Sequence, residues 1–307
     1  MKPGEQRRVS VGDVSLSVRC DGDPDSGAPV VVLHGFTGSC ESMAGVAAEL
    51  AGERAVYRLD LLGHGRADAP ADVGPYTMAR CVGQIVGVLD ALGLRAAHLL
   101  GYSMGARVAL SLCVAHPARV RSALLVGVSP GIADARARAA RVASDEALAK
   151  RIEDEGIPAF VDHWTRLPLF ASQARLDAAA RERARAQRLA NRGHGLAGSL
   201  RGMGAGAMPP LHADLLGVAL PVCLVVGAED AKFLAIAEEL RRALPDARLA
   251  VLEEAGHAAH LEQPGAFGEL ARRFLRDADA TARSRRVSAP ANDQDRRVPV
   301  VNLESRE

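Results

Sequence analysis

A serine flanked by glycines is the most informative short motif in this chain of 307 residues. The motif spans residues 101–105 and reads GYSMG, directly after an apolar run at 97–100 and at the start of a helical pattern at 104–116. A turn this tight between a strand and a helix requires small residues two positions before and two positions after the serine, and it leaves the hydroxyl exposed. The pattern therefore predicts that Ser103 is a catalytic nucleophile or base.

A serine hydroxyl needs a neighbouring imidazole to take its proton at neutral pH. His257 is the expected partner, because it follows a predicted strand at 248–252 and comes directly after Gly256, so that a short loop can direct it toward the serine. His260 is the alternative base, three residues later, and we expect it to pack in the following turn.

The imidazole in turn needs an acid that orients it and stabilises its charged form. Asp230 is the favoured acid, because it ends a short loop after a predicted strand at 222–226 and gives the chain order serine, acid, histidine. Glu229 is the adjacent alternative, and a simple surface role remains open for either carboxylate.

A second glycine-containing loop follows the predicted strand at 29–33 and reads LHGFTGS over residues 33–39. Enzymes with this kind of serine turn form an oxyanion hole from the backbone N–H of the residue after the serine and from an N–H of such an earlier loop. The expected donors are the backbone N–H groups of Met104 and Phe36, which need no rearrangement to meet a developing negative charge.

The elements around these motifs alternate between short strands and helices. A hairpin at 9–18, with its turn near Gly12-Asp13, precedes predicted strands at 29–33, 55–61, 97–100, 123–128, 222–226 and 248–252. The predicted helices lie at 42–51, 77–92, 104–116, 235–244 and 264–276. This alternation predicts an α/β fold, with a mostly parallel eight-stranded sheet covered by helices on both faces.

Residues 131–213 interrupt the alternation, because they are helical throughout and contain no strand pattern. We expect a helical cap at 131–213, inserted between two parts of the core at 1–130 and 214–279, and a disordered tail at 280–307. The cap segment holds 12 arginines and one lysine against nine acidic residues, whereas the whole chain has a net charge of only +1. Positive charge is therefore concentrated in the predicted cap.

The composition excludes several classes of protein. A near-neutral net charge and 3% aromatic residues argue against a nucleic-acid-binding surface, and no apolar run approaches the length of a membrane span. Five widely spaced cysteines without a CxxC pair predict neither a disulfide framework nor a zinc site. We expect a cytoplasmic enzyme without metal or cofactor, acting on a small molecule, with no nucleic-acid, membrane or obligate protein partner.

The motifs together resemble the α/β-hydrolase superfamily over roughly residues 9–278. Three stretches are similar, more narrowly, to the 2-succinyl-6-hydroxy-2,4-cyclohexadiene-1-carboxylate synthases (MenH) of menaquinone biosynthesis: residues 33–39, 101–107 (GYSMGAR) and 195–204 (GLAGSLRGMG). The resemblance implies a lyase that eliminates pyruvate from 2-succinyl-5-enolpyruvyl-6-hydroxy-3-cyclohexene-1-carboxylate. It also implies that the serine acts as a base on a ring proton, without an acyl-enzyme, while the oxyanion hole stabilises charge on the succinyl carbonyl.

The implied substrate carries three carboxylates, which arginine binds well through its planar guanidinium. The resemblance assigns substrate binding to Tyr102, Arg141, Trp164 and Arg188. Arg188 also belongs to a helical stripe of the kind that usually faces solvent, made of Arg181, Arg185, Arg188 and Arg192.

Two other functions compete with the lyase. The same three residues could serve a hydrolase of esters or carbon–carbon bonds, with Ser103 as nucleophile; an apolar cap would favour that function and an arginine-rich cap an anionic substrate. A non-catalytic binding protein of the same fold is the least favoured alternative, because it would typically have lost one of the three residues.

Overall fold

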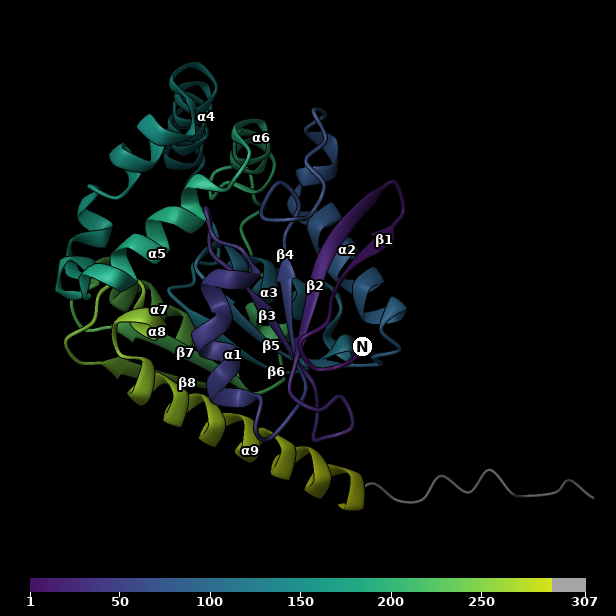
Figure 1. The fold of residues 1–307 in the computed structure, drawn as a ribbon. Helices are drawn as coiled ribbons and strands as arrows, with labels where there is room; N and C mark the ends of the chain where they lie inside the picture. The colour runs from purple at the N-terminus through teal and green to yellow at the C-terminus, as the bar shows by residue number, and fades with distance from the viewer. Residues whose placement is uncertain (289–307) are drawn as a thin grey trace, which may run out of the picture.

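The protein is built on one eight-stranded sheet, in the strand order β1-β2-β4-β3-β5-β6-β7-β8 (Figure 1). The computed structural model describes the backbone of residues 1–288 and the side chains of residues 1–283. β1 and β2 form an antiparallel hairpin, β2 pairs antiparallel with β4, and all other pairs are parallel. The strands are β1 Gln6–Val11, β2 Val14–Asp21, β3 Val30–Leu33, β4 Val56–Asp60, β5 Ala97–Tyr102, β6 Val120–Val126, β7 Val222–Gly227 and β8 Ala247–Leu252. The predicted fold class is confirmed.

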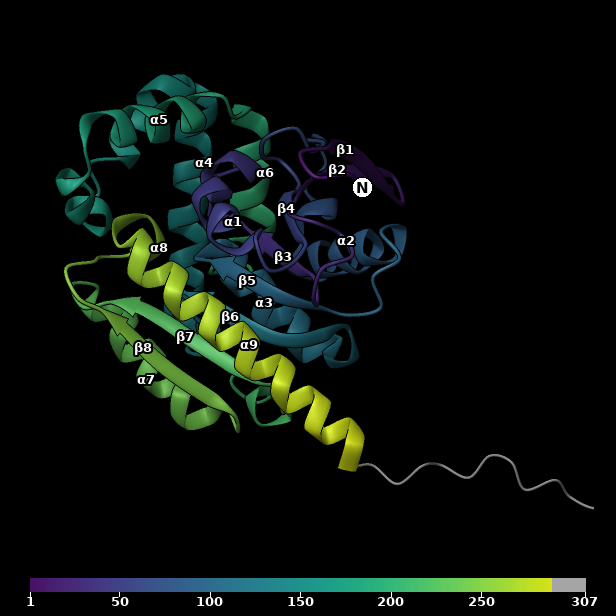
Figure 2. The ribbon, with the colours of Figure 1, turned by 60° about the horizontal axis from the view of Figure 1, so that its bottom comes forward.

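Helices cover both faces of the sheet, which explains why its central strands are apolar on both sides. One core cluster packs α2 (Met78–Ala91), α3 (Met104–Ala115) and α7 (Ala231–Ala243) against one face. A second cluster packs α1 (Ala44–Leu50) and α9 (Pro264–Ser288) against the other face, along which α9 runs in Figure 2. All four residues of β3 are buried between these layers.

The parallel register brings the functional loops together. Leu33 at the end of β3 lies opposite Gly101 in β5, so the loop after β3 starts beside the serine turn. β6 and β7 continue the sheet on the other side of β5, and the loops after β7 and β8 follow at the same edge. The carboxyl ends of the parallel strands therefore gather the sequence motifs at one edge of the sheet.

Between β6 and β7 the described chain forms only helices and loops, and this segment rises above the carboxyl edge of the sheet (Figure 1). It has a small core of its own, in which Ile152 and Phe160 of α4 pack with Leu196 of α6. Its elements are α4 Ala135–Trp164, the 3₁₀ segment η4 Pro168–Arg175, α5 Ala178–Leu189 and α6 Gly193–Met203. The non-helical backbone of Gly156 (φ 78°), two residues before Pro158, breaks α4 into two parts. We refer to residues 131–213 as the cap.

Two helix boundaries differ from the predictions by four residues or more. α7 begins at Ala231, four residues early, because the Asp230 side chain accepts a hydrogen bond from the Phe233 N–H and starts the helix. α9 continues to Ser288, so the prediction of a disordered tail from residue 280 is wrong for residues 280–288. Alanine and arginine are common there and favour helix. The rest of the predicted tail, 289–307, lies outside the described residues. No helix of the described chain is long and apolar enough to cross a membrane.

Candidate active site

Ser103 lies at the turn between β5 and α3, in a backbone conformation with φ 50° and ψ −105° that non-glycine residues rarely adopt. The flanking glycines make this turn possible. A Cβ at Gly101 would collide with the backbone of Gly105 and Ala106, and one at Gly105 would collide with the carbonyl of Leu33. The strained turn therefore holds the serine hydroxyl at the carboxyl edge of the sheet.

His257 and Asp230 complete a hydrogen-bonded series with this serine. The Ser103 hydroxyl lies 3.0 Å from His257 Nε2, to which it can donate, and His257 Nδ1 lies 2.7 Å from Asp230 Oδ2. Both His257 and Asp230 are buried. With Nδ1–H donating to the carboxylate, Nε2 is left unprotonated and able to take the serine proton. The arrangement has the geometry required of a serine activated as nucleophile or base.

The alternative residues occupy other positions. His260 is buried against Tyr102, with ring centroids 4.4 Å apart, and burial lowers its pKa to about 3. The Glu229 carboxylate pairs with Arg175 at 2.9 Å, whereas the partner of the imidazole is Asp230. The structure thus brings His257 and Asp230, rather than His260 and Glu229, to the serine.

Two neighbours of the imidazole were not singled out from the sequence. Phe233 in α7 contacts the His257 ring with centroids 4.5 Å apart. Gly127 follows β6, and a Cβ there would lie 2.7 Å from His257 Cε1. The apolar ring and the absent side chain together leave one position for the imidazole. Neither residue carries a sequence signal, because both contacts depend on how β6 and α7 pack.

The loop after β3 is held by the buried His34. The His34 Nε2 accepts a hydrogen bond from the Leu61 N–H at 3.0 Å, so its Nδ1–H donates to the Gly35 carbonyl at 2.8 Å. Burial lowers the pKa of His34, which favours this neutral form. The Gly35 carbonyl also accepts from the Gly38 N–H at 3.0 Å. The Gly35 C=O and the Phe36 N–H belong to the same trans peptide and point in opposite directions. The bonds to the Gly35 carbonyl therefore leave the Phe36 N–H pointing away from His34 and Gly38.

Met104 provides a second free donor, because the first N–H groups of a helix have no partner within the helix. It is the first residue of α3, and the first helical hydrogen bond after the turn runs from the Arg107 N–H to the Ser103 carbonyl. Phe36, Ser103 and Met104 all line one cavity. The expected oxyanion donors are therefore placed around the same space as the serine.

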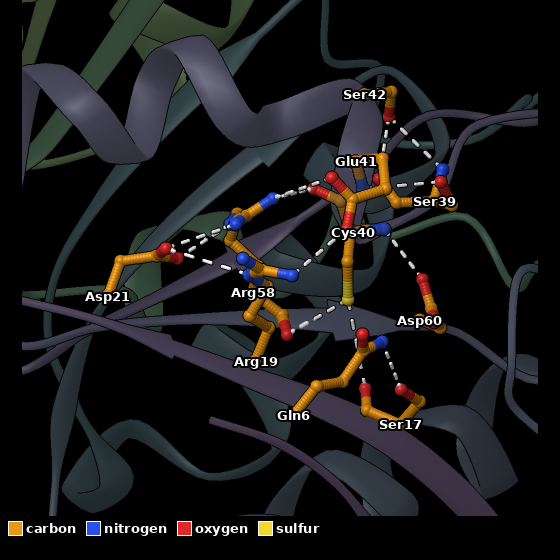
Figure 3. A network of polar contacts seen from close by, with 10 residues as sticks. All are labelled: Gln6, Ser17, Arg19, Asp21, Ser39, Cys40, Glu41, Ser42, Arg58 and Asp60. Atoms are coloured by element: carbon orange, nitrogen blue, oxygen red, sulfur yellow. Dashed lines mark hydrogen bonds and ion pairs between the residues drawn. The ribbon is translucent and has the colours of Figure 1, made fainter. Parts of the chain in front are cut away.

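A polar network fixes the remainder of this loop (Figure 3). The Asp60 carboxylate at the end of β4 accepts hydrogen bonds from the Cys40 N–H at 2.6 Å and from the Arg66 N–H at 3.0 Å. The buried Arg58 donates to the Cys40 carbonyl and pairs with Asp21 at 2.7 Å. The end of β4 thus anchors the loop that carries Phe36.

The cavity in front of the serine has a volume of about 880 Å³ and lies between the sheet edge and the cap. Aromatic side chains form much of its wall. The Trp164 ring contacts Phe36 edge to face, with centroids 5.3 Å apart, and it contacts Phe170 in a tilted arrangement at 5.5 Å. Tyr102 beside the serine also lines the cavity. A space of this size, largely apolar with a few polar groups, suits a small organic ligand.

Arginines supply the cavity with positive charge. Arg188 stacks over the Phe170 ring at 5.9 Å and reaches the Gln173 side chain at 3.4 Å, and burial lowers its pKa. Arg107 donates to the Met203 carbonyl at 2.6 Å, and burial lowers its pKa to about 10. Among the described side chains, neither arginine has a carboxylate within ion-pair distance. Two half-buried guanidinium groups therefore line the cavity without an ion-pair partner among the described side chains.

The other predicted binding residues differ in their contacts. Arg141 lines the cavity but folds back onto Asp145 at 2.8 Å, one turn along α4. Arg181 and Arg192 bind backbone carbonyls, those of Ala174 and Ala67, so only Arg188 of the stripe reaches the cavity wall. Arg107 also lines the cavity but was not singled out from the sequence. It lies four residues after Ser103, a spacing that places it on the same side of α3.

Within the described residues, no group of three histidine, cysteine, aspartate or glutamate side chains could hold a metal ion. The five cysteines are all buried and unpaired, and burial raises the pKa of the Cys81, Cys113 and Cys223 thiols to about 12.

Known proteins share both this sequence pattern and this architecture. Residues 28–264 match the family model described as alpha/beta hydrolase fold. A candidate 2-succinyl-6-hydroxy-2,4-cyclohexadiene-1-carboxylate synthase of Bacillus subtilis (strain 168) is 39% identical over 87% of this chain and 97% of its own length. The synthase of that name from Klebsiella pneumoniae (strain MGH 78578) is 35% identical over 79% of this chain and 93% of its own length.

Among solved structures, MenH from S. aureus superimposes with a TM-score of 0.82 at 28% identity, covering 85% of this chain and 98% of that one. An enol-lactonase from Burkholderia xenovorans superimposes with a TM-score of 0.77 at 25% identity, covering 88% and 100%. The family match and the long alignments agree with the order of elements described above. The chain therefore belongs to the α/β-hydrolase-fold family, and within it to the group of the 2-succinyl-6-hydroxy-2,4-cyclohexadiene-1-carboxylate synthases.

Proposed function

We propose that this protein is a carbon–oxygen lyase of menaquinone biosynthesis. It eliminates pyruvate from 2-succinyl-5-enolpyruvyl-6-hydroxy-3-cyclohexene-1-carboxylate and leaves 2-succinyl-6-hydroxy-2,4-cyclohexadiene-1-carboxylate. Relatives that align over nearly their whole length carry the name of this synthase. The observation that carries the proposal is the pair of counterion-free arginines, Arg107 and Arg188, in the cavity of the serine.

The first step is removal of the ring proton next to the succinyl ketone. Ser103 takes this proton while its own hydroxyl proton moves to His257 Nε2, 3.0 Å away. Asp230 stabilises the imidazolium through the 2.7 Å contact with Nδ1. The electron pair left on carbon moves onto the ketone oxygen, where the N–H groups of Phe36 and Met104 meet the negative charge.

The second step breaks the ring carbon–oxygen bond to the enolpyruvyl group. The electron pair returns from the enolate through the ring double bond, and the leaving group departs as the enolate of pyruvate. The proton held by His257 can then pass to this enolate, which restores the neutral imidazole and gives pyruvate. One molecule gives two and no water is consumed, so the reaction balances without a covalent intermediate on the serine.

The cavity charge suits this substrate better than a neutral ester. Burying a carboxylate is costly unless it is paired, and arginine pairs with it through two parallel hydrogen bonds. Both Arg107 and Arg188 are half-buried in the cavity wall, and burial lowers the pKa of each. A substrate with three carboxylates supplies the missing counterions, whereas a neutral ester leaves them unpaired.

The test is a comparison of two reactions in one preparation. Pyruvate release from the enolpyruvyl substrate is followed through lactate dehydrogenase and the loss of NADH absorbance, beside hydrolysis of a p-nitrophenyl ester. The lyase is expected to release pyruvate at a rate far above that of ester cleavage. Ester cleavage without pyruvate release would instead indicate a serine hydrolase.

A further inference from the structure

Glu262 is a buried carboxylate behind the histidine loop. It is the last residue of α8 (Ala259–Glu262), and its side chain is only 4% exposed. Its Oε2 accepts a hydrogen bond from the Gly256 N–H at 2.8 Å, and its Oε1 accepts one from the Ala258 N–H at 3.3 Å. These two N–H groups flank His257 in the chain, so one carboxylate holds the backbone on both sides of the imidazole.

The loop before His257 is strained and closely packed. Glu254 has a φ of 55°, a region that non-glycine residues rarely adopt. A Cβ at Gly256 would collide with the hydroxyl of Ser172 from the cap. A loop of this shape needs specific bonds to keep one conformation, and the Glu262 carboxylate provides two of them.

The charge of Glu262 is poorly compensated by other side chains. The nearest cation within the described chain is Arg175 of η4, 3.9 Å from Glu262 Oε2 and also 2.9 Å from Glu229. Burying a carboxylate is costly, and charge-assisted hydrogen bonds from backbone N–H groups are its main compensation here. The Glu262 carboxylate is therefore stabilised mainly by the two backbone N–H groups beside His257, and it holds those two peptide groups in place.

We propose that Glu262 is a positioning residue that keeps His257 in line with Ser103 and Asp230. This inference rests on the relay in the proposed function, but not on the identity of the substrate. Glu262 is not among the residues that line the cavity, so its loss leaves substrate contacts in place. A displacement of about 1 Å in a catalytic group can cost about 10²-fold in rate. The expected signature is therefore a change in kcat with little change in KM.

Three variants test the proposal. Glu262→Ala removes both bonds, Glu262→Gln keeps an oxygen for one of them in the same shape, and Arg175→Ala removes only the cation from the cap. Glu239→Ala, an exposed carboxylate on α7, is the matched control. For each variant we would measure kcat, KM, the melting temperature and the low-field NMR signal of the proton between His257 and Asp230.

Glu262→Ala is expected to lower kcat by about 10²-fold with KM within about twofold, and to weaken the low-field signal. Glu262→Gln should recover part of kcat, because it keeps one acceptor. Arg175→Ala and Glu239→Ala should keep most of the wild-type kcat. An unchanged kcat in Glu262→Gln and Glu262→Ala would overturn the proposal, and so would an equal loss in Arg175→Ala.

The same comparison separates this inference from the proposed function. If the wild type cleaves esters but releases no pyruvate, the lyase assignment fails. The ratio of variant to wild-type kcat is then measured for ester hydrolysis instead. If Glu262→Ala does not fold, the isosteric Glu262→Gln decides: a clear loss of kcat at normal stability supports positioning, and wild-type kcat overturns it.

Discussion

Arg188 combines partial burial, an aromatic contact and the lack of a carboxylate partner among the described side chains. Its guanidinium lies over Phe170 and is held weakly by Gln173, so it remains available to an anion in the cavity. A desolvated cation gains more from pairing with an anion than a surface cation does, because less water screens the interaction. In the proposed function this residue binds one substrate carboxylate.

Replacing Arg188 by alanine should lower kcat/KM for pyruvate release by about 10²-fold, because a charge-assisted pair contributes about 2–3 kcal/mol. Arg188→Lys should be intermediate, since it keeps the charge but loses the planar fork. Steady-state kinetics measure both. The control is Arg185→Ala, one turn away, whose side chain is 41% exposed and pairs with Asp162 on the surface. Equal kinetics for Arg188→Ala and Arg185→Ala would assign Arg188 to the solvent-facing stripe.

Single residues of the site were predictable to different degrees. Ser103, His257 and Asp230 could be placed because each follows a strand, and strand ends converge in a parallel sheet. Phe170 could not, since its position depends on how the cap packs over the sheet, whereas Arg107 is four residues after Ser103 and could have been found from that spacing. The sequence also could not reveal that Arg141 folds onto Asp145, a choice between two partners that only the local geometry decides.

At the scale of elements, α9 is fastened to the sheet by Asp279. This carboxylate lies 3.1 Å from Arg54, 3.1 Å from His98 Nε2 and 3.4 Å from Arg121. Burial opposes its charged form, but these donors prevail and hold the pKa of Asp279 well below its usual range. One side chain therefore links the far part of α9 to β5 and β6.

Asp279→Asn should lower the free energy of unfolding by about 3 kcal/mol at pH 7, because it leaves buried cations without a charged partner. The loss should shrink as the pH falls below about 4, because the unfolded chain then binds a proton at this carboxylate while the fold still holds it charged. Urea unfolding monitored by circular dichroism provides the measurement. Asp277→Asn is the matched control, an exposed pair with Arg248 that should cost less than about 1 kcal/mol. A loss no larger than that of the control would refute the anchoring role.

Most elements followed from the apolar patterns, and the exceptions have local causes. The buried strands β3, β4, β5 and β7 lie where the patterns place them, within two residues, and the hairpin of β1 and β2 extends three residues further at each end than predicted. β6 begins three residues earlier than predicted, at Val120, because pairing with β5 extends it through the polar Arg121 and Ser122. α8 was missed, since a helix of four residues is too short to show periodicity.

At the scale of the whole molecule, four buried histidines remain neutral. Burial lowers the pKa of His34, His64, His98 and His260, the last to about 3. In the unfolded chain each would titrate near its ordinary value of about 6.5. Below that pH the unfolded state binds protons that the folded state does not, so acid favours unfolding.

The free energy of unfolding should therefore fall as the pH is lowered from 7 to 5. Each of the four histidines contributes a slope of up to about 1.4 kcal/mol per pH unit below its unfolded pKa. Urea unfolding at intervals of half a pH unit gives the slope. His116→Gln, at an exposed histidine, should keep the full slope, and His98→Gln should reduce it. A stability that stays flat between pH 7 and pH 5 would show that these histidines are protonated in the fold.

The central claim is that Ser103 acts as the base of a pyruvate-eliminating lyase. The most direct measurement is pyruvate release by the wild type and by Ser103→Ala, each with its folded fraction determined by circular dichroism. We expect Ser103→Ala to keep its fold and to lose about 10³-fold or more in kcat, because no other group can take the ring proton at that position. Pyruvate release near the wild-type rate by folded Ser103→Ala would contradict the account.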